Sequence, residues 1–261
     1  MQKRHSDSEQ YFNEQATATR RYIYPFIDSR FPISENITVA EIGCGAGGDL
    51  LPFLEAGCTA YGIDIDANAI NLAHKFYARR EENSRLTLIA NDIFDINPPS
   101  LPSFDLIIMR DVLEHIHNHK RFVTHLSRFL KPDGVVFMAF PPFSMPFGGH
   151  QQMCRNKIAS VIPYYHLLPR RLYAGILRLF GESEGRIEGL LEIKDTRIHL
   201  WKFHRMIAES DFEILAERLY LINPNYEVKF GLKPRRLPAI LNIPRVREFF
   251  ITTCYELLGK K

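Results

Sequence analysis

Apolar residues in the first 140 positions gather in short runs, separated by stretches with helical spacing. The runs rich in β-branched residues cover residues 37–42, 59–65, 86–90, 104–109 and 134–140. Between them, apolar residues recur at every third or fourth position over residues 48–55, 67–80 and 120–130. Strands that alternate with helices at this spacing form βαβ units, whose right-handed crossovers build a parallel sheet covered on both faces. The pattern therefore predicts an α/β fold with a doubly wound, Rossmann-like sheet.

The regular alternation stops after Phe140 and resumes near His199. From there we predict a helix at residues 200–210 and two strands, at 213–221 and 226–230, joined as an antiparallel hairpin by a turn at 223–225. A last helix is predicted over residues 246–258, and a first one over residues 9–26. We expect a single domain, 1–261. Its parts are an N-terminal helical segment (1–36), a core sheet (37–142 and 199–231), an inserted cap (143–198) and a basic C-terminal tail (232–261).

Charge is unevenly distributed along the chain. The 261 residues include 33 Lys and Arg and 30 Asp and Glu, a net charge of +3. Residues 141–181 contain five basic residues and residues 228–247 contain six, with no acid in either segment, so the rest of the chain sums to −8. The sequence therefore describes an acidic body with two basic segments.

The cysteines and the hydropathy indicate a compartment. Cys44, Cys58, Cys154 and Cys254 lie far apart without a CxxC pair, which excludes a disulfide framework and a zinc ribbon. Residues 1–10 lack the apolar stretch of a signal peptide, and no window reaches the roughly 18 apolar residues of a membrane span. We therefore expect a cytoplasmic protein, with a peripheral position at a membrane as the second option.

The segment that leaves the first predicted strand is rich in glycine. Gly43, Gly45 and Gly48 satisfy the dinucleotide-binding spacing GxGxxG, and Asp64 follows at about the distance of a ribose-binding acid. Glu41, however, directly precedes the glycines, where a carboxylate would repel a pyrophosphate. A cationic ligand without phosphate, such as S-adenosylmethionine, suits this position better.

Two further acids end the second and third predicted strands. Asp64, followed by Ile65, is placed to accept both ribose hydroxyls, and Asp92 to accept from an adenine amino group, with Ile93 against the ring. In open α/β sheets, ligands bind at these carboxyl ends of strands. For Asp92, capping of the next helix is the alternative interpretation.

At these positions the sequence resembles the class I S-adenosylmethionine-dependent methyltransferases. Glu41-x-Gly43-x-Gly45-x-Gly47 is similar to their first motif, and residues 104–115 are similar to their fourth-strand motif. The runs DVLEH at 111–115 and LKPDG at 130–134 are closest to the branch of ubiquinone-type and other small-molecule, lipid and glycan methyltransferases. The resemblance implies a seven-stranded sheet of order 3-2-1-4-5-7-6, S-adenosylmethionine as methyl donor, S-adenosylhomocysteine as product, and an acceptor methylated on oxygen.

The resemblance also indicates where the acceptor lies. Arg110 and Asp111 leave the fourth strand on the sulfonium side, and Asp111 either contacts substrate or caps the following helix. If the acceptor carries a proton, a general base is needed. The candidates are His150, which follows Gly148-Gly149, and His115 of the fourth-strand motif. Helix capping for His150 and a buried hydrogen bond for His115 remain the alternatives.

Several other side chains receive weaker assignments. His115, His117 and His119 do not complete a tetrahedral site, and we expect no metal. Arg20 and Tyr11 of the first helix are candidates to close over the methionine carboxylate, as N-terminal helices do in related enzymes. His199 and His204 flank Trp201, where packing and substrate contact are both open.

The two basic segments bear on the class of acceptor. The stretch 167–180 has the basic, amphipathic character of a membrane-surface helix, and residues 237–250 repeat it. These segments either form an entrance for a lipid-linked or anionic acceptor, rest on an acidic leaflet, or pack on each other and keep the protein soluble. Nucleic acid is disfavoured because no RNA- or DNA-binding signature occurs. The rival functions are a non-catalytic S-adenosylmethionine-binding scaffold and, more distantly, an NAD(P)-dependent oxidoreductase.

Overall fold

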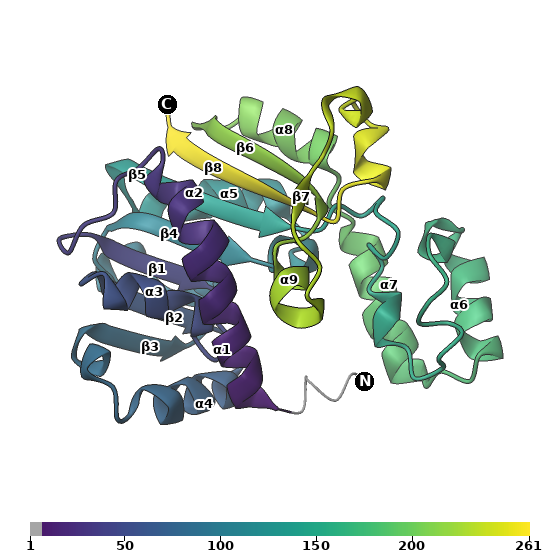
Figure 1. Ribbon diagram of the computed structural model, residues 1–261, viewed down its shortest axis with the longest axis horizontal. Coiled ribbons are helices and arrows are strands. Elements are labelled where there is room, and N and C mark those ends of the chain that lie inside the picture. Colours follow the sequence, from purple (N-terminus) through teal and green to yellow (C-terminus); the bar gives the residue numbers. More distant parts are fainter. Residues whose placement is uncertain (1–6) are drawn as a thin grey trace.

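Eight strands form one mixed sheet with helices on both faces in the computed structural model, which describes residues 7–261 (Figure 1). Residues 1–6 of the predicted N-terminal segment lie outside the described residues. The order of the strands is β3-β2-β1-β4-β5-β8-β6-β7. Their bounds are β1 Thr38–Ile42, β2 Thr59–Asp64, β3 Leu86–Ala90, β4 Phe104–Arg110, β5 Leu130–Phe140, β6 Phe212–Ile222, β7 Arg235–Arg236 and β8 Thr253–Lys260.

The first five strands are parallel and confirm the predicted doubly wound half of the sheet. β5 begins at Leu130, earlier than the predicted run 134–140, because the turn-forming residues Pro132-Asp133-Gly134 lie inside the strand. Phe104 pairs with Leu130, but Leu106 already pairs with Val135, so the three turn residues are accommodated in a bulge.

Nine helices are described between residues 7 and 261. They are α1 Ser8–Ala18, α2 Tyr24–Asp28, α3 Leu51–Glu55, α4 Ala67–Tyr77, α5 His119–Leu126, α6 Arg170–Leu179, α7 Glu184–Thr196, α8 Leu200–Ala208 and α9 Asn225–Phe230. A π-helical turn, Thr19–Ile23, joins α1 to α2, which confirms the predicted first helix. Helices α1 to α4 pack on one face of the sheet, and α5 and α8 pack on the other. Both faces of the parallel strands are therefore buried, as βαβ crossovers require.

The predicted hairpin after β6 is wrong, because the second segment is the helix α9. Tyr226, Val228 and Phe230 alternate with charged residues as in a half-buried strand. Helix signals flank them, however: Pro224 stands just before the first turn, and Gly231 closes the helix with φ +70°. The helix signals at the two ends therefore decide the structure of this segment, although its alternating residues predict a strand.

The partner of β6 comes instead from the C-terminal tail, where a helix was predicted. β8 runs antiparallel to both β5 and β6. It is buried on both faces from Thr253 to Gly259, so its apolar residues show no alternation that would reveal a strand. β7, a two-residue edge strand, brings the count to eight where seven were predicted.

The inserted cap is a separate layer beside the sheet and contains α6 and α7 (Figure 1). Its apolar residues form a small core of their own, made of Cys154, Ala159, Tyr165, Tyr173, Ala174, Leu177, Ile187, Leu190 and Leu191. One side of α6 is therefore buried within the cap, and this core contains no residue of the basic tail on which the segment was alternatively expected to pack. Within residues 7–261, no helix is long and apolar enough to cross a membrane.

The position of β8 predicts a large cost for removing Tyr255. Its ring lies 5.7, 5.2 and 5.0 Å from the rings of Phe26, Phe137 and Tyr220, and the residue is 2% exposed. We expect Tyr255→Ala to lower the free energy of unfolding by about 3–5 kcal/mol in denaturant titrations, whereas Tyr255→Phe, which keeps the ring, costs about 1 kcal/mol. A loss below about 1 kcal/mol for Tyr255→Ala would contradict the central position of β8.

Candidate functional site

The glycine loop joins β1 to α3 and contains three residues with left-handed backbone. Gly43, Gly45 and Gly47 have φ of +75°, +53° and +79°, which side chains disfavour. A Cβ on Gly43 would lie 2.4 Å from the side chain of Val112, so this glycine allows the loop to pack on the segment after β4. A Cβ on Gly45 would meet no atom within 4 Å. The backbone at Gly45 therefore faces open space at the carboxyl end of the sheet, where a ligand can approach it.

Asp64, at the end of β2, fastens this loop. Its Oδ2 accepts a hydrogen bond from the Gly45 amide at 2.7 Å, and its Oδ1 accepts one from the Asp66 amide at 2.8 Å. Each carboxylate oxygen keeps a further lone pair, so the fixed side chain can still accept from two hydroxyls. Ile65 follows with 74% of its surface exposed. The geometry thus presents a polar and an apolar group side by side next to Gly45.

Asp92 and Ile93 follow β3. Asp92 Oδ1 accepts from the Phe94 amide at 2.9 Å, so the helix-capping interpretation of this residue is confirmed. Ile93 is buried in the core, and its carbonyl accepts a hydrogen bond from His125 at 2.8 Å. The adenine contacts assigned to these two residues remain predictions.

Three ionisable side chains are buried together beside the glycine loop: Glu41 of β1, Asp49 just after the glycines and Arg110 at the end of β4. Arg110 Nη1 forms an ion pair with Asp49 Oδ1 at 2.9 Å, and the Thr19 hydroxyl donates a hydrogen bond to the same oxygen. The side chains of Glu41 and Asp49 are hydrogen-bonded to each other. Arg110 Nη1 is buried without a hydrogen-bond partner among residues 7–261. A buried donor of this kind indicates that a ligand acceptor completes the site.

Burial sets the charge on this cluster. It raises the pKa of Glu41 well above its usual range, and the neighbouring Asp49 raises it further. Burial also raises the pKa of Asp49, but Arg110 and the hydrogen bonds from Thr19 and Glu41 act in the opposite direction. The two carboxyls therefore hold one proton, on Glu41, while Asp49 is ionised against Arg110. Sequence reasoning missed Asp49, whose only signal was an acid in the first turn after a glycine loop.

Helix α1 crosses the carboxyl end of β1 next to the glycine loop, with α9 beside it (Figure 1). A Cβ on Gly48 would lie 2.6 Å from the carbonyl oxygen of Phe12, so α1 packs directly on the loop. A small cavity next to Arg110 is lined by Tyr11, Glu14, Gln15, Arg110, Asn225, Val228 and Lys229. Tyr11 thus lies near Arg110, and its contact with the methionine carboxylate stays a prediction. Arg20 does not line this cavity, since it forms a surface ion pair with Glu55 at 2.6 Å.

The segment after β4 carries the predicted acceptor-side residues. Asp111 has φ +56° and is exposed, and no side chain caps the turn Leu113–His115, so the capping interpretation of Asp111 is wrong. The rings of His115 and His150 meet edge to face, 5.6 Å apart. His150 likewise has a left-handed backbone, with φ +54°, and its side chain caps no helix. The structure therefore brings Asp111, His115 and His150 together.

Glu114 is a further member of this group that sequence reasoning missed. Both of its carboxylate oxygens are buried without a hydrogen-bond partner, and Oε1 lies 3.8 Å from His150 Nε2. Burial raises the pKa of Glu114 well above its usual range, and Asp111 raises it further. Burial and the nearby His115 lower the pKa of His150 to about 4. At neutral pH, His150 is therefore an uncharged imidazole that can accept a proton.

The remaining histidines have structural contacts. His119 is hydrogen-bonded to the Leu113 carbonyl at 2.9 Å, and His117 pairs with Glu192 at the surface. His115 and His119 lie on different helical segments. His199 contacts Ser144 and Glu248, which joins the cap to the tail.

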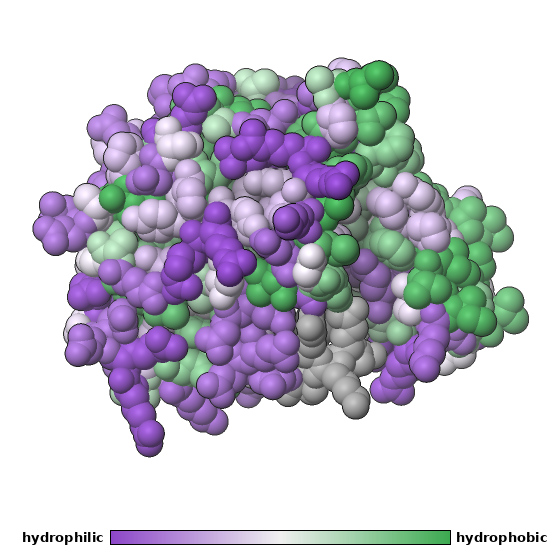
Figure 2. All heavy atoms as spheres, in the orientation of Figure 1, coloured by the Kyte–Doolittle hydropathy of each residue, from purple (hydrophilic) through white to green (hydrophobic). Residues whose placement is uncertain are grey.

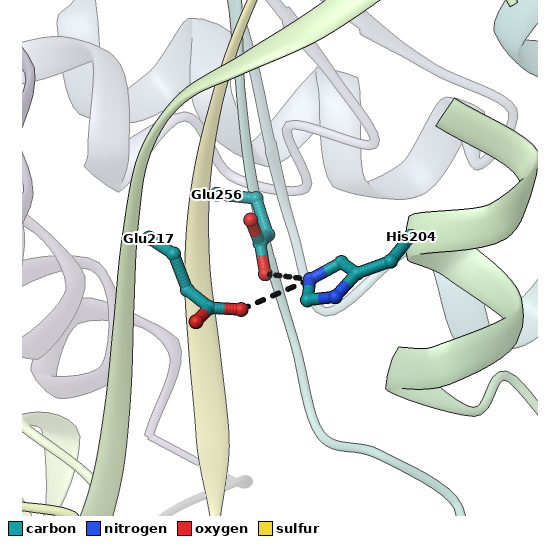
Figure 3. Close-up of side chains that lie close together, drawn as sticks. All are labelled: His204, Glu217 and Glu256. Atoms are coloured by element: carbon teal, nitrogen blue, oxygen red, sulfur yellow. Dashed lines mark hydrogen bonds and ion pairs between the residues drawn. The ribbon is translucent and has the colours of Figure 1, made fainter. Parts of the chain in front are cut away.

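His204 of α8 points between two acids of the antiparallel strands (Figure 3). Its Nε2 lies 2.9 Å from Glu217 of β6 and 3.0 Å from Glu256 of β8. Despite burial, the hydrogen bonds to these carboxylates raise the pKa of His204 to about 9. Arg247 Nη1 lies 3.6 Å from Glu217. The three side chains could hold a metal ion, but His204 and Arg247 already supply the positive charge that the two acids require. The absence of metal stays a prediction.

Comparison with known proteins shows which family and which relatives the chain is similar to. Residues 40–136 match the model of a methyltransferase domain family. A ubiquinone biosynthesis O-methyltransferase of Pelagibacter ubique (strain HTCC1062) is 30% identical over 108 residues, which cover 40% of this chain and 42% of the relative. The chain thus spans less than half the length of this curated relative.

Solved structures extend the likeness to nearly the whole fold. Magnesium protoporphyrin IX methyltransferase from Synechocystis PCC 6803, with bound S-adenosylhomocysteine, superposes with a TM-score of 0.56 at 14% identity and covers 95% of this chain and 84% of its own. Geranyl diphosphate C-methyltransferase from Streptomyces coelicolor A3(2) gives a TM-score of 0.57 at 12% identity, over 91% of this chain and 74% of its own. These likenesses show a shared Rossmann-like fold.

The match with the family model covers the glycine loop and the strands around it. Residues 40–136 include Glu41, Asp64, Asp92, Arg110 and Asp111. The resemblance to class I S-adenosylmethionine-dependent methyltransferases is thereby confirmed over β1 to β5.

The buried charges next to the glycine loop predict unequal effects of two neutral substitutions. Asp49→Asn removes the partner of the buried Arg110, and we expect it to lower the free energy of unfolding by about 3 kcal/mol. Glu41→Gln replaces a protonated carboxyl with a neutral amide and should change that free energy by less than about 1 kcal/mol. Urea titration at neutral pH measures both. Equal losses, or a larger loss for Glu41→Gln, would contradict the placement of the proton.

Proposed function

We propose that the protein is an S-adenosylmethionine-dependent methyltransferase that methylates an oxygen atom of a small-molecule, lipid-linked or glycan-linked acceptor. The observation that carries the proposal is the open backbone at Gly45, held by Asp64 at the carboxyl end of the sheet, within a segment that matches methyltransferase domains. Bound S-adenosylmethionine would supply an activated methyl group on a sulfonium. The chain's own residues would position it and the acceptor.

The cofactor-binding residues follow from the geometry of the loop. Gly43, Gly45 and Gly47 allow the backbone to approach the methionine portion, and a carboxyl oxygen of Glu41 can accept from an ammonium group. Arg110 and Tyr11 lie where a carboxylate would be bound. In this proposal Asp64 accepts the ribose hydroxyls and Ile65 covers one side of the adenosine, with Asp92 and Ile93 at the base.

On the acceptor side, His150 is the proposed general base. As the acceptor oxygen forms its bond to the methyl carbon, its O–H bond breaks and the proton passes to the imidazole of His150. His115 packs against His150 and fixes its ring, and the buried Glu114 lies on the other side of Nε2. Asp111, exposed in a left-handed conformation beside them, would contact the acceptor. A scaffold protein that only binds the cofactor would not need this arrangement.

The first test concerns Asp64. We expect Asp64→Ala to weaken S-adenosylhomocysteine binding by at least about tenfold in isothermal titration, because two charge-assisted hydrogen bonds and the loop contact are lost. Asp133→Ala, an exposed acid in the β5 bulge, is the matched control and should leave the affinity unchanged. Equal affinity for the wild type and the Asp64→Ala variant would contradict the cofactor assignment.

The second test concerns His150. With whichever phenol or alcohol in a panel gives S-adenosylhomocysteine most rapidly, His150→Ala should lower turnover by about 10²–10⁴-fold and leave S-adenosylhomocysteine affinity within about twofold. Because the pKa of His150 is lowered to about 4, wild-type kcat/KM should rise with pH through that value and level off above it. His117→Ala, at the surface, is the control. Full turnover by His150→Ala would remove His150 from the reaction but not the methyltransferase assignment.

A further inference from the structure

We propose that one end of the protein, formed by the inserted cap and the C-terminal tail, docks on an anionic membrane surface. The docking face is defined by Ile158, Val161, Leu172 and Leu179 of the cap and by Ile240 and Ile243 of the tail. The proposal concerns where the protein acts and does not depend on the proposed methyl transfer.

Exposed apolar side chains concentrate on these two segments. Nineteen large apolar residues are exposed in the described part of the chain, and fourteen of them lie in the cap or between residues 231 and 252. Leu179 and Ile240 are each 83% exposed, and Leu172 is 58% exposed. Figure 2 shows hydrophobic side chains gathered over α6 and over the tail, at the same end of the molecule, while the neighbouring surface is mainly hydrophilic. Concentrations of this kind mark interaction sites.

Helix α6 has an apolar stripe on each side. Its inner stripe, with Tyr173, Ala174 and Leu177, packs in the core of the cap. Leu172 and Leu179 lie seven residues apart, and hence on one face of the helix, and this second stripe is turned away from that core. Packing within the cap explains the inner stripe only. An interfacial helix, in contrast, needs an exposed apolar face of this kind.

The tail is joined to the cap at this end of the molecule. The Tyr164 hydroxyl donates to the Phe249 carbonyl at 2.9 Å, and the two rings lie 6.3 Å apart. Glu248, next to Phe249, accepts from the Trp201 amide and contacts His199. These contacts fix the tail against the cap and against the start of α8. The exposed apolar residues of the cap and those of the tail are therefore held in fixed positions relative to each other.

Charge selects an anionic surface as the partner. Residues 141–181 and 228–247 contain eleven basic and no acidic residues. Lys157, Arg171 and Arg236 are exposed and form no ion pair with any residue from 7 to 261. Long basic side chains beside exposed leucines can reach lipid phosphates while the leucines enter the acyl boundary. A second copy of the chain would bring two positively charged faces together. A phosphate polymer without an apolar part would leave the exposed leucines in water. Both partners therefore fit this face less well than an anionic membrane does.

Flotation with lipid vesicles tests the docking face on the full chain. We expect the wild type to float with phosphatidylcholine vesicles that contain phosphatidylglycerol and not with phosphatidylcholine alone. Binding should be lost near 0.5 M salt, where the screening length falls to about 4 Å. Leu172→Ser/Leu179→Ser and Lys157→Glu/Arg171→Glu should each weaken binding by at least about tenfold, because each removes two contacts with the surface.

Matched controls keep the proposal falsifiable. Ile214→Ser, an exposed apolar residue of β6, and Arg128→Glu, an exposed basic residue before β5, should bind vesicles like the wild type. Failure of the wild type to float, or unchanged binding of both double variants, would overturn the proposal. Dimers in light scattering that dissociate in Leu172→Ser/Leu179→Ser, without any vesicle binding, would assign the face to a second copy instead. Circular dichroism of each variant verifies that α6 is intact.

Discussion

The buried ion pair between Arg110 and Asp49 connects the parts on which the site depends. Arg110 ends β4, Asp49 follows the glycine loop, and Thr19 of the N-terminal helical segment donates to the same carboxylate. Ion pairs removed from water stabilise a fold only when their polar atoms are satisfied. Here Glu41 shares a proton with Asp49, but Arg110 Nη1 keeps no hydrogen-bond partner among residues 7–261. The protein thus carries a polar site that is incomplete without a ligand, at the place where the glycine loop opens.

This arrangement changes the electrostatic argument that the sequence suggested. Glu41 was expected to attract a cation by its own charge, yet its burial favours the protonated form and Arg110 stands beside it. The site as a whole, with one arginine, one ionised aspartate and one shared proton, can accommodate both the ammonium and the carboxylate of an amino acid. A ligand with a methionine end therefore suits it better than a pyrophosphate, which carries no positive group.

The parallel half of the fold was predictable, because each of its strands is a short apolar run between helical stretches, and the glycine loop, Asp64 and the residues after β4 were recognised with it. The antiparallel half was not. β8 is buried on both faces and shows no alternation, so the sequence pattern predicted a helix there. In α9 the residues alternate as in a strand, but Pro224 and Gly231 at its two ends favour the helix that forms. Asp49 and Glu114 were missed for a different reason: a buried acid differs from an exposed one only through distant neighbours such as Arg110 and His150. His150 was found because two glycines precede it, although its contact with His115 required the fold.

Equilibrium binding of S-adenosylhomocysteine and of NAD+ to the wild-type protein tests the central claim most directly, since the glycine spacing alone allows either ligand. The account predicts micromolar or tighter binding of S-adenosylhomocysteine and no detectable binding of NAD+ in the same titration. Binding of NAD+ without S-adenosylhomocysteine would contradict it.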